Sequence, residues 1–264
     1  MQDTIEERFR LSCKIVRSAG TLAKGYFADL ASLTIQSKGV QDMASEADVN
    51  TENLLRSEIA KHYPADIFLG EESYKDCQLD PTRGTWVVDP IDGTQPFVSG
   101  IPSWCISIAY VEDNVTQIGV VYDPVHDELF AAQRGYGATL NGRPIRTTSA
   151  QGVGSGLVSM GYSMRVKPEQ TLGPMTRLLA ANGMFHRGGS GALSLAYVAA
   201  GRFIGYYEPH MYAWDALAGL LLACEAGGKA KPFLVDSKSL INGNAVLVAG
   251  ASVYPDLDAI VSGR

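Results

Sequence analysis

Apolar residues recur every three to four positions near the start of the chain, which is the spacing of an amphipathic helix. The pattern runs over residues 4–33 and predicts one long helix. Residues 48–62 repeat this spacing and end before Pro64, so they predict a second helix. Between the two, residues 36–45 are polar and contain Gly39, which is typical of a mobile loop.

Shorter apolar runs follow, and they indicate strands. Residues 67–69 form one run, stopped by Gly70, and residues 85–89 form another, stopped by Pro90. Residues 104–133 contain three further runs, separated by the turn-like sequences EDN and DPVHD. These three runs predict an antiparallel meander.

The second half of the chain mixes strand-like and helix-like patterns. The pattern predicts strands at residues 157–162, 203–207 and 244–250, and helices at residues 168–182, 191–200, 214–226 and 253–262. Such mixing around a central meander indicates an α+β or layered α/β/α architecture rather than a doubly wound parallel sheet. The chain shows no internal repeat, low-complexity tract or obvious flexible linker, so composition alone sets no domain boundary.

Composition and charge exclude several classes of protein. The 264 residues are 46% hydrophobic, which is ample for a sizeable core. The net charge is −6 and the 22 basic residues are scattered, which argues against a nucleic-acid or anionic-membrane surface. The four cysteines lie far apart without a C-x-x-C pair, so neither a zinc knuckle nor a disulfide framework is indicated. With no signal-like N-terminus and no run of eighteen apolar residues, we expect a soluble, cytoplasmic protein.

Acidic residues stand where apolar strands end or where an apolar helix begins. Glu71 follows IFLG, Asp89 and Asp92 flank Pro90, and Asp215 opens a helix-like run. Side chains at such positions can converge. Crowded ionised carboxylates repel one another, so they either become protonated or share cations. These stretches contain no Cys or His, and an oxygen-only ligand set favours Mg²⁺, Mn²⁺ or Ca²⁺.

The segment WVVDPIDGT has further features of a metal and phosphate site. Pro90 cannot continue a strand ladder, so we expect it to turn the chain out of the sheet and to free the Ile91 carbonyl as an oxygen ligand. Gly93 and Thr94 then add backbone N–H groups and a hydroxyl at the opening of a helix, where anions bind.

VDPIDGT, with GEES upstream and WDALAGLLLACEAGG downstream, resembles the inositol monophosphatase family of Mg²⁺-dependent, lithium-sensitive phosphatases. The resemblance covers nearly the whole chain and includes the GSGALSLAYVAAGR segment. A lone D-x-x-D would be weak evidence, but five motifs in the family's order are specific.

The resemblance implies an α+β fold, the layered αβαβα sandwich that this family shares with fructose-1,6-bisphosphatase. It implies a single catalytic unit over residues 1–264, with an N-terminal α+β part of about 1–145 and a C-terminal α/β part of about 146–264. A homodimer is also implied.

The resemblance also implies a ligand set. Glu71 and Asp89 would hold a first metal together with the Ile91 carbonyl, and Asp89, Asp92 and Asp215 would hold a second. Two or three Mg²⁺ ions are expected, with Mn²⁺ as an alternative and with Ca²⁺ and Li⁺ as inhibitors. We favour Glu71 over the adjacent Glu72 as the ligand from the family's pattern.

The catalytic roles follow from the same resemblance. A water activated by a metal near Glu71 would attack phosphorus, oriented by the Thr94 hydroxyl, which would hydrogen-bond Asp48. The loop with Lys38 and Asp42 would close over a weaker third ion. The alternative interpretation is that Lys38 and Asp42 are solvated surface residues without a function in the site.

Substrate contacts are expected from Asp92, Gly93, Thr94, Ser190, Gly191, Glu208 and Asp215. Glu208 lies seven residues before Asp215, where the family places the carboxylate that binds polyol hydroxyls, and this favours inositol monophosphate. The chain departs from many relatives at Gln95 and Pro96 and at residues 210–212, both of which border the expected alcohol pocket.

Those departures leave rival functions open. The alternative substrates are histidinol phosphate, adenosine 3′,5′-bisphosphate and fructose 1,6-bisphosphate. The segment FVSGIP slightly favours the first of these. A regulatory role on the transcription machinery is the non-enzymatic alternative. His126 and His186 are not needed by the chemistry, and Ser190 lacks the surroundings of a serine-hydrolase nucleophile. The expected partners are a small phosphate monoester and a second copy of the chain, with neither nucleic acid nor a membrane.

Overall fold

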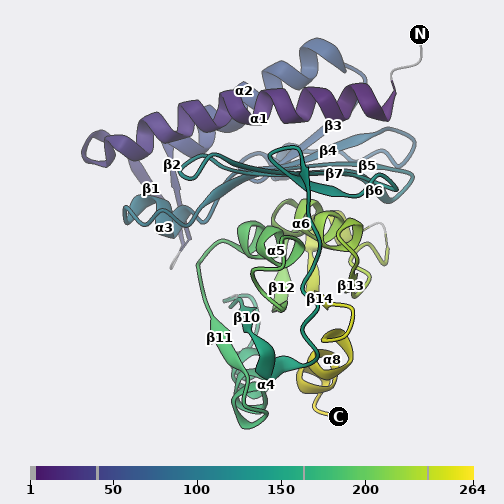
Figure 1. The fold of residues 1–264 in the computed structure, drawn as a ribbon. Helices are drawn as coiled ribbons and strands as arrows, with labels where there is room; N and C mark the ends of the chain where they lie inside the picture. The colour runs from purple at the N-terminus through teal and green to yellow at the C-terminus, as the bar shows by residue number, and fades with distance from the viewer. Residues whose placement is uncertain (1–3, 40–41, 163, 237) are drawn as a thin grey trace.

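The chain forms alternating layers of helices and sheets. The computed structural model describes residues 4–39, 42–162, 164–236 and 238–264, and the side chains of residues 35–44 lie outside this description. Two helices cover the outer face of a seven-stranded sheet, two more lie between this sheet and a five-stranded one, and a last pair covers the far side (Figure 1). This is the αβαβα arrangement, so the predicted α+β class is confirmed.

The seven-stranded sheet is formed by consecutive strands of the first half. Its order is β3 (Ile67–Gly70), β4 (Thr85–Asp92), β5 (Cys105–Glu112), β6 (Val115–Asp123), β7 (Glu128–Gln133), β8 (Ala138–Leu140) and β9 (Arg143–Pro144). β3 runs parallel to β4 and each later pair is antiparallel, as the predicted meander requires. All eight residues of β4 are buried.

The outer helices are α1 (Ile5–Ala28) and α2 (Glu46–His62), and the central helices are α5 (Gly191–Ala199) and α6 (Ala213–Glu225). Side chains alternate along β4, so Trp86 and Val88 pack in the cluster under α1 and α2, whereas Val87 packs in the cluster with α5 and α6. β4 therefore lies between two hydrophobic cores, one on each face of the sheet.

The five-stranded sheet has the order β11 (Met184–His186), β10 (Leu157–Met160), β12 (Gly205–Met211), β14 (Asn244–Gly250) and β13 (Gly228–Ala230). A third core cluster joins this sheet to α4 (Glu169–Ala180) and α8 (Tyr254–Ser262). The remaining helical pieces are short: α3 (Thr94–Val98), α7 (Ser239–Asn242) and turns at Leu30–Ser32, Tyr74–Asp76 and Val153–Ser155.

Three expectations about local structure were wrong. Within the range 36–45 that was predicted as a loop, the described residues instead belong to two paired antiparallel strands, β1 (Ile35–Gly39) and β2 (Asp42–Ser45). The first helix ends at Ala28, because Asp29 at its C-cap leaves helical geometry and a separate turn follows. Pro90 does not end β4.

The strand continues past Pro90 through a bulge. Asp89 pairs with Ser107 and Asp92 pairs with Cys105, and the register shifts between them. A bulge leaves the proline outside the ladder, so its missing N–H costs no hydrogen bond.

The sequence predicts no helix that spans a membrane. No helix within the described residues is long and apolar enough to cross a membrane.

Candidate metal and substrate site

Three of the predicted acids meet at the C-terminal end of β4. Asp89, Asp92 and Asp215 each offer a carboxylate oxygen, and these oxygens all lie within 4.8 Å of one another. Asp89 and Asp92 come from the two sides of the β4 bulge, and Asp215 comes from the first turn of α6. Glu71 follows the parallel neighbour β3, where its N–H donates to the Val88 carbonyl at 3.1 Å.

The acids are crowded and poorly solvated. Burial raises the pKa of Asp89 well above its usual range, and the charges of Glu71, Asp92 and Asp215 raise it further. Burial, Asp92 and Glu208 raise the pKa of Asp215 to about 7. A group of oxygen donors that repel one another in this way fits a hard divalent cation, which would offset the repulsion.

Asp92 is anchored by the N-terminus of α5. Its Oδ2 accepts hydrogen bonds from the Ser190 hydroxyl and from the Ala192 N–H at 2.6 Å. The thiol of Cys105, the cross-strand partner of Asp92, lies 3.8 Å from the same oxygen. These hydrogen bonds fix the position of the Asp92 carboxylate relative to α5.

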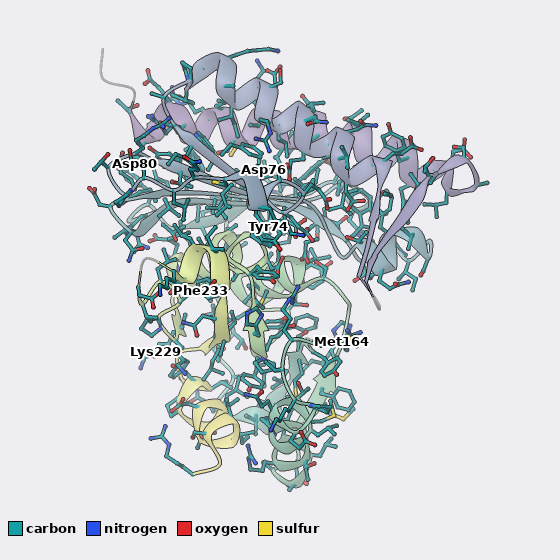
Figure 2. All side chains as sticks on the ribbon, turned by 180° about the vertical axis from the view of Figure 1, so that it is seen from behind. Tyr74, Asp76, Asp80, Met164, Lys229 and Phe233 are labelled. Atoms are coloured by element: carbon teal, nitrogen blue, oxygen red, sulfur yellow. The ribbon has the colours of Figure 1, made fainter. Side chains whose placement is uncertain are left out.

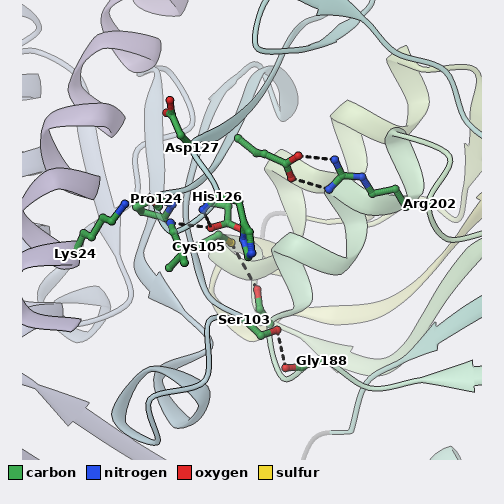
Figure 3. Close-up of polar contacts among 12 residues, drawn as sticks. Lys24, Ser103, Cys105, Pro124, His126, Asp127, Gly188 and Arg202 are labelled. Atoms are coloured by element: carbon green, nitrogen blue, oxygen red, sulfur yellow. Dashed lines mark hydrogen bonds and ion pairs between the residues drawn. The ribbon is translucent and has the colours of Figure 1, made fainter. Parts of the chain in front are cut away.

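Ser190 therefore has a role that the sequence did not indicate. Its hydroxyl donates to Asp92 and accepts from the Leu193 N–H at 3.2 Å, as the N-cap of α5. Ser103 donates to the Gly188 carbonyl at 2.9 Å and so ties the loop after α3 to the glycine-rich turn before α5 (Figure 3).

Thr94 lies beside the acids and contacts Asp48, as predicted. Its Oγ1 is 3.3 Å from Asp48 Oδ1 and 3.2 Å from the Ile91 carbonyl oxygen. Asp48 is fully buried, and its Oδ2 accepts from both the N–H and the hydroxyl of Ser45, the N-cap of α2. Gly93 has φ +97°, and a Cβ there would lie 2.9 Å from the Ser103 carbonyl oxygen, so glycine is required.

Glu208 lies in a small pocket next to these groups. The pocket has a volume of about 60 Å³ and is lined mostly by polar atoms of Ser159, Met160, Gly161, Tyr162, Arg187, Gly188, Gly189, Ser190, Gly191, Ser194, Tyr206 and Glu208. The Tyr206 hydroxyl donates to Glu208. Burial raises the pKa of Glu208 to about 7, opposed by the hydrogen bond from Tyr206.

The family model described as the inositol monophosphatase family matches residues 4–254. The chain belongs to this family. Its relatives include the Nus factor SuhB of Xylella fastidiosa, which is 38% identical over 217 residues, or 81% of this chain and 78% of the relative. The inositol-1-monophosphatase of Rhizobium meliloti is 37% identical over 218 residues, or 81% of this chain and 80% of the relative.

Solved structures of family members have the same fold. The extragenic suppressor protein suhB from Bartonella henselae superimposes with a TM-score of 0.86 at 29% identity, covering 96% of this chain and 97% of that one. Inositol monophosphatase from Anabaena gives a TM-score of 0.82 at 30% identity, covering 98% and 96%. The relatives' names thus include both an inositol-1-monophosphatase and a Nus factor.

Two predicted residues lie outside the described side chains, and two histidines make contacts of their own. Lys38 and Asp42 lie on the β1–β2 hairpin, but their side chains are outside the described part of the structure. His210 is absent from the pocket lining, and its Nε2 donates to the Asn242 carbonyl at 2.7 Å. His126 instead pairs with the buried Asp123 on the β6–β7 turn (Figure 3).

Aromatic packing, which the motifs did not indicate, joins two of the family's motifs. Tyr74 lies just after GEES, where the first sheet meets the helical layer (Figure 2). Its ring centroid is 5.2 Å from that of Trp214, the residue before Asp215. The turn that carries Glu71 and the helix that carries Asp215 are therefore packed against each other.

Proposed function

We propose that the protein is a Mg²⁺-dependent phosphomonoesterase that hydrolyses a small phosphorylated polyol, with inositol monophosphate as the favoured substrate. The observation that carries the proposal is the convergence of Asp89, Asp92 and Asp215 within 4.8 Å beside the Glu208 pocket. Family membership supports the same chemistry.

The acids would hold the cations, two or three in number. Glu71, Asp89 and the Ile91 carbonyl would form one site, and Asp89, Asp92 and Asp215 would form the other. Bound Mg²⁺ offsets the charge of the phosphate and lowers the pKa of a nearby water.

The chain's own groups would orient the reactants. If the Thr94 hydroxyl donates to Asp48, its lone pairs are left to accept a hydrogen bond from the attacking water. The backbone N–H groups of Gly93 and Thr94 would bind phosphate oxygens. Gly191 and Glu208 would bind the alcohol, with the Ser190 hydroxyl acting through Asp92.

The pocket supports a polyol over a nucleoside. Its polar lining suits several hydroxyl groups, whereas an adenine ring favours apolar or stacking surfaces. A Glu208 carboxyl with a pKa of about 7 can accept a hydrogen bond from a substrate hydroxyl when charged and can donate one when protonated.

A panel of substrates tests the proposal. Phosphate release would be measured with Mg²⁺ on inositol 1-phosphate, histidinol phosphate, adenosine 3′,5′-bisphosphate and fructose 1,6-bisphosphate, with Asp92→Asn as the inactive control. We expect the highest kcat/KM on inositol 1-phosphate. Turnover of histidinol phosphate alone would overturn the substrate assignment, and release from none of the four would overturn the enzyme itself.

A second function is favoured by the relatives' names. Several relatives, among them that of Escherichia coli at 35% identity over 240 residues, are named Nus factor SuhB. We therefore propose a contact with the transcription machinery as the alternative role. If an Asp92→Asn protein that binds no Mg²⁺ and releases no phosphate fully rescued a null strain, this role would replace catalysis as the biological function.

We also propose that two copies of the chain associate through the β11 edge of the second sheet. Met184 and Phe185 on β11 are 64% and 43% exposed, and Leu172 and Leu179 on the adjacent α4 are 55% and 48% exposed. Apolar side chains gathered at a sheet edge are typical of an interface.

A further inference from the structure

The turn that carries Glu71 rests on a buried acid from another element. The turn spans residues 70–73 and closes with a hydrogen bond from the Ser73 N–H to the Gly70 carbonyl. Glu52 of α2 lies beneath it: its Oε2 accepts the Glu72 N–H at 2.8 Å and its Oε1 accepts the Ser73 hydroxyl at 2.6 Å. The Glu52 side chain is only 3% exposed.

The fit between Glu52 and the turn is close. A Cβ at Gly70 would overlap Glu52 Oε2, so only glycine allows the strand end to approach the carboxylate. Hydrogen bonds from N–H and hydroxyl groups to a buried carboxylate are charge-assisted and strong. The turn therefore has little freedom to shift relative to α2.

The charge of Glu52 is balanced locally. Arg56, one turn further along α2, lies 2.9 Å from Glu52 Oε1, and its guanidinium stacks over the Phe68 ring of β3 at 4.4 Å. Glu52 is not one of the three acids whose oxygens converge. Both of its oxygens are used to hold the turn, which separates its role from that of a metal ligand.

The same helix also holds Thr94. Asp48 precedes Glu52 by four residues, which is about one helical turn, so both side chains leave the same face of α2. Asp48 contacts Thr94 and Glu52 contacts the Glu71 turn. One rigid element thus sets the separation between two groups from different parts of the chain.

We propose that Glu52 is a positioning residue that fixes the Glu71 carboxylate for metal binding. The inference rests on the proposed function only in taking Glu71 as a ligand. Residues that hold metal ligands typically contribute 10-fold to 100-fold to metal affinity or activity. We expect a Glu52→Gln protein to bind Mg²⁺ about 10-fold or more weakly, because glutamine cannot accept both hydrogen bonds with the same geometry.

The matched control lies on the same helix. Glu58 is paired with Lys61 at the surface, whereas Glu52 is bonded to the turn, so Glu58→Gln makes the same chemical change elsewhere on α2. The affinity for Mg²⁺ alone would be measured by titration calorimetry, and the Mg²⁺ concentration for half-maximal phosphate release would be measured separately. Glu58→Gln should leave both unchanged.

A double variant tests whether Glu52 acts through Glu71. In the presence of Glu71→Gln, adding Glu52→Gln should weaken Mg²⁺ binding no further, since the ligand it positions is already lost. At saturating Mg²⁺ the Glu52→Gln enzyme should recover a kcat within a few-fold of wild type, which general misfolding would not allow. Ser73→Ala, which removes one contact, should shift Mg²⁺ affinity in the same direction by a smaller factor.

The outcomes separate the two proposals. Unchanged Mg²⁺ affinity in folded Glu52→Gln, or an equal additional loss in the Glu71→Gln background, overturns the role of Glu52. If Glu52→Gln does not fold, unchanged affinity in Ser73→Ala overturns it. Mg²⁺ binding without phosphate release from wild type overturns the proposed function but leaves the calorimetric comparison decisive. No Mg²⁺ binding by wild type overturns both.

Discussion

Removing one charge from the acid cluster should stabilise the metal-free protein. Asp215→Asn keeps the size of the side chain, and its amide oxygen can still accept the Tyr212 N–H, which lies 3.1 Å from Asp215 Oδ2. The substitution removes a carboxylate that burial, Asp92 and Glu208 disfavour in its charged form. It therefore tests whether the cluster is strained by repulsion.

The magnitude follows from the pKa. The pKa of Asp215 rises from 3.8 to about 7 on folding. A group with a raised folded pKa contributes stability that is fully present below its unfolded pKa and is lost as pH rises through its folded pKa. Three pKa units correspond to about 4 kcal/mol, and since the charges are shared with neighbouring acids, we expect the free energy of unfolding at pH 8 to rise by about 2 to 4 kcal/mol in the variant.

Urea unfolding in EDTA at pH 5 and pH 8 measures this effect. Wild type should lose more stability than Asp215→Asn between the two pH values, and the order of stability at pH 8 should reverse when saturating Mg²⁺ is added, because ligand binding stabilises the folded wild type. Asp236→Asn is the control. Hydrogen bonds from Ser239 and Lys238 lower the pKa of Asp236, so its stabilisation is present above pH 4 and is lost only at lower pH.

The reasoning would be refuted if Asp215→Asn were less stable than wild type in EDTA by the same amount at pH 5 and pH 8. That result would mean that the hydrogen bond to the Tyr212 N–H dominates and that repulsion within the cluster is weak. It would also remove the physical argument that the acids require a cation.

Three further substitutions test separate parts of the site and the surface. Thr94→Ala should lower kcat by about 10² or more while Thr94→Ser retains most activity, and equal loss in both would exclude a role for the hydroxyl. Glu208→Gln should raise KM for inositol 1-phosphate about ten-fold with a smaller change in kcat, and an unchanged KM would remove Glu208 from the alcohol site. Met184→Glu should convert a dimer to a monomer in light scattering. The control is Val235→Glu, which changes an apolar residue that is 63% exposed but lies outside the β11 edge, and it should leave the dimer intact. If both variants remained dimers, the interface would lie elsewhere.

Sequence reasoning was strongest where a pattern is long or a motif is complete. The helix predicted at residues 48–62 appears as α2, Glu46–His62, because periodic apolar positions and the acidic first turn agree. The meander appears as β5, β6 and β7 for the same reason: its turns and its apolar runs point to one register. Asp89, Asp92 and Asp215 converge because the C-terminal end of β4 meets the first turn of α6, which packs on the same sheet.

Short elements and long-range contacts were beyond the sequence. The three residues of β11 and of β13 are too few to show a period of two, and β1 and β2 pair through polar residues that look like a loop. Pro90 was expected to end β4, since proline removes a ladder hydrogen bond. The bulge that accommodates it depends on the partner strand, which no local pattern reveals.

Two residues that contact the site region, Glu52 and Cys105, illustrate the same limit. Glu52 resembles any acid on a solvated helix face, and Cys105 resembles any apolar strand residue. Their roles appear only when Glu52 is found 2.8 Å from the Glu72 N–H and Cys105 is found opposite Asp92. The spacing of Glu52 one helical turn after Asp48 is the sequence feature that could have indicated the first of these.

The fold separates the chemistry from the choice of substrate. Glu71, Asp89 and Asp92 stand on the first sheet, whereas Glu208 stands on β12 of the second. Within the site, the second half contacts the first where the N-terminus of α5 binds Asp92 Oδ2 through the Ser190 hydroxyl and the Ala192 N–H. Changes in the second sheet can therefore alter the alcohol pocket while the acids keep their geometry, provided that the contacts to Asp92 and the position of α6, which carries Asp215, are kept. Exchange of Ser190 should consequently affect Mg²⁺ dependence and substrate affinity together, whereas exchange of Glu208 should affect substrate affinity more than Mg²⁺ dependence.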